Sequence, residues 1–139
     1  YEQIRQMAAK CPYEVRFLGR LSQPELAKVY QESDIFVLPS FFDGLPLTVI
    51  EALACGDRVV MSDLPGIRKW LMEAAPGGDV RFVEMPQMRN TDEPVPETLP
   101  AFEERLAEAL LASIRTRERR TADVSRISWE GIAAKVAEV

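Results

Sequence analysis

The sequence has no histidine, only two cysteines, and no apolar run long enough to cross a bilayer. Any imidazole that takes part in function must therefore come from outside this chain. Cys11 and Cys55 are too few for a disulfide framework and lack metal-ligand spacing, which favours a reducing, cytoplasmic location. A spanning helix needs about 20 apolar residues, and residues 1–10 lack the apolar segment of a signal peptide. We therefore expect a protein that is neither exported nor membrane-spanning.

Positive charge is also scarce, because 17 Lys and Arg face 22 Asp and Glu. A net charge of -5 argues against nucleic-acid binding, which needs clustered cations to neutralise phosphates. The 139 residues, 47% of them hydrophobic, fit one globular domain spanning residues 1–139. The chain starts without Met and enters a helical pattern at once, so we expect a piece of a longer protein.

Short apolar runs alternate with helical patterns along the first 83 residues. The runs that predict β-strands are 15–18, 35–38, 59–61 and 80–83. Helical spacing follows at 24–32, 47–54 and 67–75, after an opening helix. Near-continuous apolar strands separated by helices indicate a parallel sheet covered on both faces. The expected fold is α/β, with a Rossmann-like parallel sheet of about four strands flanked by helices.

The last third of the chain is less regular. Residues 86–100 contain four prolines among polar residues, which predicts a long Pro-rich loop within the domain. Helical spacing resumes at 102–114, and the basic run Arg115 to Arg120 is interpreted as a solvated helix end. Contact of this run with anionic lipid headgroups is the weaker alternative. Ser128 fits the N-cap of a final helix that starts near Trp129.

Ligands of open parallel sheets bind where loops leave the carboxyl ends of the strands. The predicted loops there are 19–20, 39–46 and 62–66. In the middle loop, Gly44 permits close backbone approach and Pro46 suits the first position of the next helix. Free N–H groups at that helix end form an anion site suited to a diphosphate. Asp43 and Glu51, eight residues apart, could both line this cleft and accept hydrogen bonds from sugar or ribose hydroxyls.

The pattern alone leaves another interpretation open. Asp43 could simply cap a turn, and Glu51 could be a solvated helix residue, as most carboxylates at such positions are. On spacing alone this plainer interpretation is favoured.

The amino-acid sequences of four segments favour the donor-site interpretation instead. VRFLGRL, PELAKVYQESDIFVLPS, FFDGLPLTVIEALACG and VVMSDLPGI, within residues 14–85, resemble family 4 glycosyltransferases throughout. SWEGIAAKV near the end resembles their closing helix less specifically. The resemblance implies the donor-binding, C-terminal domain of an enzyme with the GT-B fold. It also implies that the upstream strand-helix units and the acceptor domain of the family lie outside this chain.

The same resemblance assigns roles to individual residues. Asp43 and Glu51 would correspond to the E-x7-E pair, with Asp43 catalytic beside the transferred sugar and Glu51 on the ribose. The complete donor-binding set is Gly19 and Arg20 beside the base, Ser40, Asp43, Gly44, Leu45, Pro46, Leu47, Thr48 and Glu51. Three departures from the family pattern are the shorter Asp43 in place of Glu, Asp57-Arg58 before the third strand, and Pro65 in place of a frequent Gly.

The implied function is transfer of a hexose from a UDP- or GDP-sugar to an acceptor, with retention of configuration. No metal or other cofactor is expected, because the chain has no Asp-x-Asp pair and the helix N-terminus can meet the diphosphate. The acceptor would bind to a separate N-terminal domain, and the whole protein could contact the cytoplasmic face of a membrane. The alternative is a non-catalytic nucleotide-sensing or protein-interaction module. A GT-B epimerase is disfavoured because the loop sequences resemble family 4 glycosyltransferases more closely.

Overall fold

The computed structural model describes residues 1–116, 118–128 and 137, and its centre is a parallel sheet. The sheet has the strand order β1–β2–β3, with β1 at Ile35–Leu38, β2 at Arg58–Ser62 and β3 at Val80–Val83. Phe36 of β1 pairs with Val59 of β2, and Met61 of β2 with Phe82 of β3. The expected α/β class with a parallel sheet is confirmed, with three strands.

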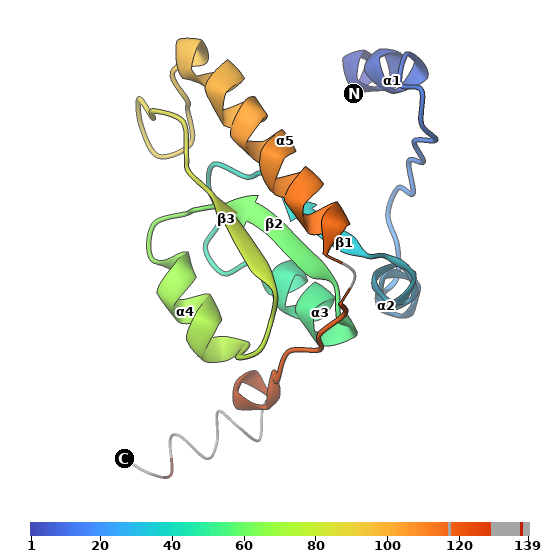
Figure 1. The fold of residues 1–139 in the computed structure, drawn as a ribbon, viewed down its shortest axis with the longest axis vertical. Helices are drawn as coiled ribbons and strands as arrows, with labels where there is room; N and C mark the ends of the chain where they lie inside the picture. The colour runs from blue at the N-terminus through green and yellow to red at the C-terminus, as the bar shows by residue number, and fades with distance from the viewer. Residues whose placement is uncertain (117, 129–136, 138–139) are drawn as a thin grey trace.

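Helices cover both faces of the sheet (Figure 1). α3 (Leu47–Cys55) and α4 (Ile67–Ala74) lie on one face, and α5 (Leu99–Arg115) crosses the other. β2 shows why, because its buried side chains alternate between the two layers. Val59 and Met61 join the core under α3 and α4, while Val60 packs with Val83 and Phe102 under α5. The domain is therefore built in three layers.

α2 (Gln23–Glu32) flanks this body and packs against α3. Its start is fixed by a capping box, in which the Ser22 backbone N–H donates to Glu25 Oε2 at 2.8 Å. Tyr30, near its other end, is buried and makes an edge-to-face contact with Phe36 of β1. α2 is thereby fastened beside both α3 and the sheet.

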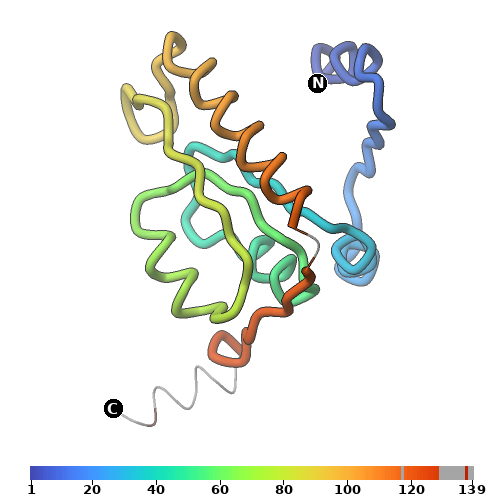
Figure 2. The backbone as a smooth tube through the Cα atoms, in the orientation of Figure 1, coloured from blue at the N-terminus to red at the C-terminus, as the bar shows by residue number. Residues whose placement is uncertain are grey.

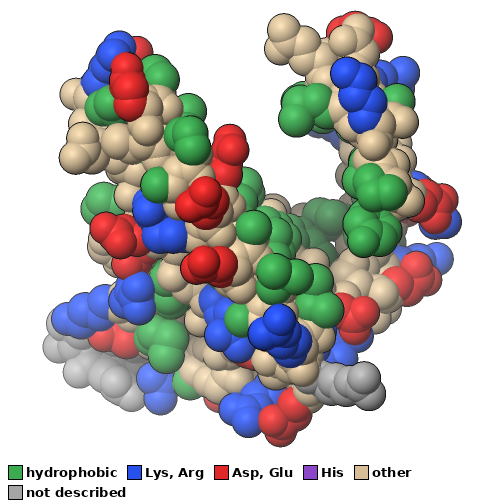
Figure 3. Space-filling view, turned by 45° about the horizontal axis from the view of Figure 1, so that its top comes forward, with side chains coloured by type: hydrophobic (Ala, Val, Ile, Leu, Met, Phe, Trp, Pro, Cys, Tyr) green, Lys and Arg blue, Asp and Glu red, His purple; other side chains and the backbone are tan. Residues whose placement is uncertain are grey.

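The strand expected at 15–18 is wrong. These residues form no strand and belong to an exposed arm, which we define as residues 1–21 and which begins with α1 (Glu2–Ala9). Figures 1 and 3 show the arm standing beside the packed body. Its apolar side chains are largely exposed, including Tyr1, Met7, Tyr13, Val15, Phe17 and Leu18. An apolar run becomes a strand only when a neighbouring strand accepts its hydrogen bonds, and the described chain places none beside it.

The Pro-rich segment is shorter than expected. Pro96–Thr98 forms a 3-10 turn, and α5 begins at Leu99, with Pro100 in its first turn. Proline is tolerated there because the first amides of a helix have no intrahelical acceptor. The remaining loop is itself ordered: Val95 N–H donates to Gln87 O at 2.7 Å.

Of the basic run Arg115 to Arg120, Arg115 is the exposed end of α5, as expected, but the described residues of the run after it are not helical. Instead, Arg119 reaches back to the packed body, where its Nη2 lies 2.9 Å from Cys55 O and 3.2 Å from Gln31 O. The chain then runs past α3 (Figure 2). There Ala122 N–H donates to Leu53 O at 3.1 Å. This connection ties the ends of α2 and α3 together. The helix expected from Trp129 onward lies outside the described residues.

Gly56 lies directly beside the Arg119 side chain. It ends α3 in the left-handed conformation, at φ 90°. A Cβ at this position would lie 2.9 Å from Arg119 Nε, closer than such atoms approach. The left-handed backbone therefore favours glycine, and a larger residue would also make the Arg119 side chain shift.

Among the described residues, none of the helices combines the length and the apolar character needed to cross a membrane.

Candidate functional site

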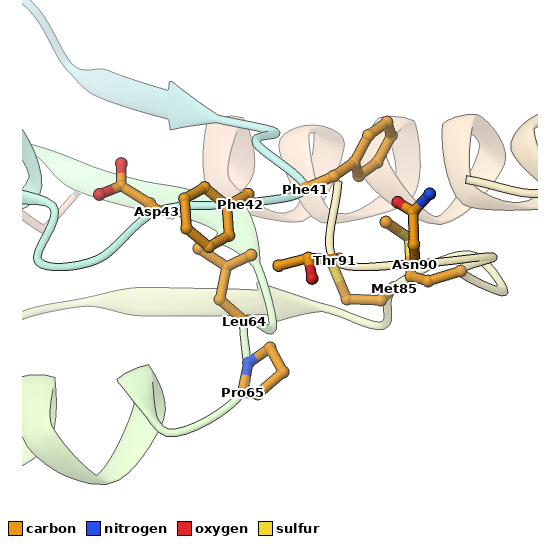
Figure 4. Close-up of a pocket in the computed structure, with 9 residues that line it drawn as sticks. Phe41, Phe42, Asp43, Leu64, Pro65, Met85, Asn90 and Thr91 are labelled. Carbon is orange, nitrogen blue, oxygen red and sulfur yellow. The ribbon is translucent and has the colours of Figure 1, made fainter. Parts of the chain in front are cut away.

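Three loops meet at the carboxyl edge of the sheet. Residues 39–46 follow β1, residues 63–66 follow β2, and residues 84–95 follow β3. In parallel sheets this edge is where ligands bind. Figure 4 shows side chains from all three loops around one cavity at this edge.

The loop after β1 leads into the N-terminal end of α3. Leu47 N–H donates to Leu45 O at 2.8 Å and Val49 N–H to Pro46 O at 3.0 Å. Within the described chain, no backbone carbonyl accepts from the amide of Thr48, which lies in the first turn of α3. Leu45, Leu47 and Thr48 are exposed, and so this helix end is open to a ligand.

Gly44 is also exposed at this end. A Cβ built on it meets no atom within 4 Å, and its φ is not positive. The fold itself therefore does not require glycine here. What glycine leaves is open space beside the backbone, as the sequence interpretation supposed for a close ligand approach.

Asp43 lines a cavity of about 310 Å³ at the sheet edge. Its neighbours there are mainly apolar side chains of the three loops (Figure 4). Phe41, on the wall, is held by an edge-to-face contact with Phe102 of α5, with the ring centroids 5.3 Å apart. Asp43 thus stands at a rigid, mostly apolar hollow.

Glu51 lines a different cavity, of about 220 Å³, between α2 and α3. Tyr30 lies on its wall, and burial together with the nearby Glu51 carboxylate raises the pKa of the phenol to about 12. Cys55 is also there, and burial raises the pKa of its thiol. Because a thiol must ionise to act as a nucleophile, Cys55 is unsuited to that role at neutral pH.

The structure therefore places the two carboxylates in separate cavities. A ligand that touched both Asp43 and Glu51 would have to pass the N-terminal turn of α3, which joins them in sequence. That turn is where the open amide of Thr48 lies. An extended ligand whose middle is anionic would suit this order of groups.

The two remaining predicted residues lie on the exposed arm. Gly19 has φ 66°, a left-handed conformation that favours glycine. Arg20 is exposed and has no ion pair within the described chain. Both lie just before α2, whose Gln23 and Ala27 line the cavity of Glu51. Ser40, in the loop after β1, is half-buried.

The loop after β2 is fastened to the body. Asp63 forms an ion pair with Arg68 of α4 at 2.7 Å, and the Arg68 guanidinium stacks over Phe82 of β3 at 4.3 Å. Gly66 has φ 80° at the start of α4. Pro65 adds further stiffness, so this wall of the Asp43 cavity is preformed.

Sequence reasoning missed the loop after β3. Met85, Met88, Asn90 and Thr91 line the Asp43 cavity, although the sequence interpretation treated this segment as connection only. The signal was available, because a loop that follows a third parallel strand must leave the sheet at the same edge. Tyr30 was missed for another reason: its place beside Glu51 depends on how α2 packs against α3.

The three layers and the loops gathered at one edge make this a Rossmann-like α/β domain. The chain belongs to the group 1 glycosyl transferases, since the model of that family matches residues 1–84.

Several curated relatives support this membership. The chain is 41% identical over 63 residues to the N,N'-diacetylbacillosaminyl-diphospho-undecaprenol alpha-1,3-N-acetylgalactosaminyltransferase of Campylobacter jejuni, covering 45% of this chain and 16% of that protein. It is 27% identical over 147 aligned positions to the phosphatidyl-myo-inositol mannosyltransferase of Mycobacterium leprae, covering 99% of this chain and 34% of that protein. It is 39% identical over 54 residues to the D-inositol 3-phosphate glycosyltransferase of Rhodococcus erythropolis, covering 39% of this chain and 12% of that protein. The chain thus spans about a third or less of these relatives.

Proposed function

We propose that this chain is the donor-binding part of a retaining glycosyltransferase, which transfers a hexose from a UDP- or GDP-sugar to an acceptor. Membership of the group 1 glycosyl transferases supports the reaction class. The observation that carries the donor site is the open first turn of α3 between two carboxylates, Asp43 and Glu51.

In this proposal each part of the donor has its own contacts. The diphosphate lies at the first turn of α3, where the open amide of Thr48 and the helix dipole favour an anion. The ribose hydroxyls donate to Glu51 in the cavity between α2 and α3, with the base toward Gly19 and Arg20. The sugar meets Asp43 and the backbone of Gly44 and Leu45. Ser40 and Pro46 shape the loop that holds them.

Catalysis in this proposal needs no nucleophile from the described chain. The helix end stabilises the leaving diphosphate electrostatically, and binding fixes the geometry of the reacting groups. The acceptor binds to a separate domain. Relatives whose names include a diphospho-undecaprenol and a phosphatidyl-inositol support a lipid-linked acceptor, reached at the cytoplasmic face of a membrane.

A second candidate is a non-catalytic nucleotide-sensing module. It is favoured by one observation, the placement of Asp43 and Glu51 in separate cavities, because a sensor needs only the cavity of Glu51. Such a module would bind the nucleoside diphosphate and its sugar derivative equally well.

The test is calorimetric titration of the full-length protein with UDP, GDP and their sugars, with and without EDTA. We expect one base to be preferred, the sugar to add affinity, and EDTA to change nothing, because the N-terminal end of α3 takes the place of a metal at the diphosphate. Affinity that collapses on chelation and returns with Mg²⁺ or Mn²⁺ would contradict this site. Equal affinity for the nucleotide and its sugar would favour the sensor.

A further inference from the structure

The cavity beside Asp43 has a chemical character that the proposed function does not use. Of its lining residues, six are apolar and come in pairs from the three loops: Phe41, Phe42, Leu64, Pro65, Met85 and Met88. Figure 4 shows Asp43 at one end, Asn90 at the other, and Phe42, Leu64 and Thr91 between them. The cavity therefore offers a carboxylate at one end and mostly apolar walls.

One of its polar side chains is already engaged. The Asn90 amide oxygen accepts from Asp92 N–H at 3.2 Å and Glu93 N–H at 3.0 Å, and its amide nitrogen donates to Glu93 Oε2 at 3.0 Å. Together with the pairing of Met88 and Pro94, these bonds hold the loop as a fixed wall. Within the described chain, Asp43 and Thr91 have no such partner, so they are the side chains open to a ligand.

The family model matches residues 1–84, and Met85, Met88, Asn90 and Thr91 follow that match directly.

A plain hexose suits such a cavity poorly. At the one position where it differs from an acetamido sugar, its hydroxyl group would face phenylalanine, leucine, proline and methionine, and a buried hydroxyl without a partner is unfavourable. An acetamido group fits better, because its N–H can donate to the carboxylate of Asp43 while its methyl group enters the apolar interior. The exposed ring of Phe42 adds an apolar face against which the sugar can lie.

We propose that the sugar bound at Asp43 carries an N-acetyl group, with its methyl in the cavity walled by Met85 and Met88. This rests on the proposed function, which places the transferred sugar at Asp43. It deepens that function by naming the class of donor as a nucleotide-linked acetamido sugar.

The first experiment compares matched donors by calorimetry on the full-length protein. The probes are UDP, GDP, GDP-mannose, UDP-glucose with UDP-N-acetylglucosamine, and UDP-galactose with UDP-N-acetylgalactosamine. We expect one acetamido donor to bind at least about tenfold more tightly than its hexose counterpart, the discrimination that a small apolar group brings in an apolar pocket. Failure of both UDP and GDP to bind would overturn the proposed function itself. Binding of UDP or GDP with a hexose donor preferred would overturn this inference alone.

The second experiment tests the wall. Met88→Ser removes apolar surface from the cavity, and Met72→Ser makes the same change on the exposed side of α4 as a matched control. We expect Met88→Ser to reduce the preference for the acetamido donor several-fold, measured as the ratio of the two sugar affinities. The control keeps that ratio. Melting curves of both variants check folding, and a ratio unchanged in a folded Met88→Ser variant would overturn the inference.

Discussion

The exposed arm and the packed body contain similar apolar residues but use them differently. In the body, Val59, Val60 and Met61 are each 0% exposed between two helical layers. In the arm, Tyr13 is 80% exposed and Met7 is 73% exposed. The arm has its own contacts, because Tyr1 and Phe17 meet edge-to-face and Arg5 lies over both rings. Apolar side chains thus create a core only where other layers enclose them.

The largest expected effect is a difference in the free energy of unfolding between side-chain deletions in the body and in the arm. Leu53 of α3 is fully buried, so Leu53→Ala leaves a cavity and should lower the free energy of unfolding by about 2–5 kcal/mol. Phe17→Ala in the arm removes a larger side chain and should lower it by less than about 1 kcal/mol, because that side chain is already half in solvent. Urea denaturation measures both. Equal losses would mean that the arm packs as firmly as the body.

The next largest effect on the free energy of unfolding should come from removing the Arg119 side chain. Arg119→Ala removes the cation that lies beside the carbonyls ending α2 and α3, and 3.5 Å from the buried Asp57. Hydrogen bonds to charged groups contribute about 1.5–3 kcal/mol, and we expect a loss in that range by urea denaturation. Arg120→Ala is the matched control, since Arg120 pairs only with the exposed Glu118 in the described chain and should change little. Similar effects of both variants would contradict a specific role for Arg119.

The sequence predicted the body far better than the contacts around it. β1 and β3 match their expected ranges, and β2 extends one residue further at each end, because apolar, β-branched runs carry that information locally. The run at 15–18 has the same local pattern, yet strand formation depends on a neighbour elsewhere in the chain. Arg119 illustrates the same limit, because its partner Tyr30 lies 89 residues away. For the site, the loops after β1 and β2 followed from strand order, whereas the separate cavities of Asp43 and Glu51 depend on packing.

Titration of Asp57 should make the stability of the body depend on pH. Burial raises the pKa of this carboxyl to about 6, against the opposing effect of Arg119, from an ordinary 3.8. Between about pH 4 and 6 the folded state then holds more protons than the unfolded state. The free energy of unfolding should therefore fall as the pH rises through this window, by at most about 1.4 kcal/mol per pH unit.

Asp57→Asn isolates this contribution. The variant keeps the shape of the side chain but cannot ionise, so its unfolding free energy should lack this decline between pH 4 and 6. The measurement is urea denaturation of both proteins at pH 4, 5, 6 and 7, compared as a difference so that other titrating groups cancel. If the difference stays constant across the series, Asp57 titrates alike in both states and its burial does not govern its charge.

The smallest expected effects are changes in donor affinity, which show whether the arm takes part in binding or only the body does. In the proposed site Glu51, in the body, holds the ribose, while Asp43 meets the sugar. Glu51→Gln keeps the shape but replaces charge-assisted hydrogen bonds of about 1.5–3 kcal/mol with neutral ones of about 1. Roughly a tenfold loss of affinity should follow for the nucleoside diphosphate and its sugar alike, at about 1.4 kcal/mol per factor of ten. Asp43→Asn should weaken the sugar-bearing donor alone.

Arg20→Ala, in the arm, should lower the donor affinity less than Glu51→Gln does, because Arg20 is exposed and a ligand contact there remains accessible to water. Calorimetry on the full-length protein with both ligands, accompanied by melting curves, measures all three variants. If Arg20→Ala proves the most damaging, the arm carries the donor site and the body serves as its support; if Asp43→Asn and Glu51→Gln both bind like the parent, the two carboxylates are surface groups and the proposed site is wrong.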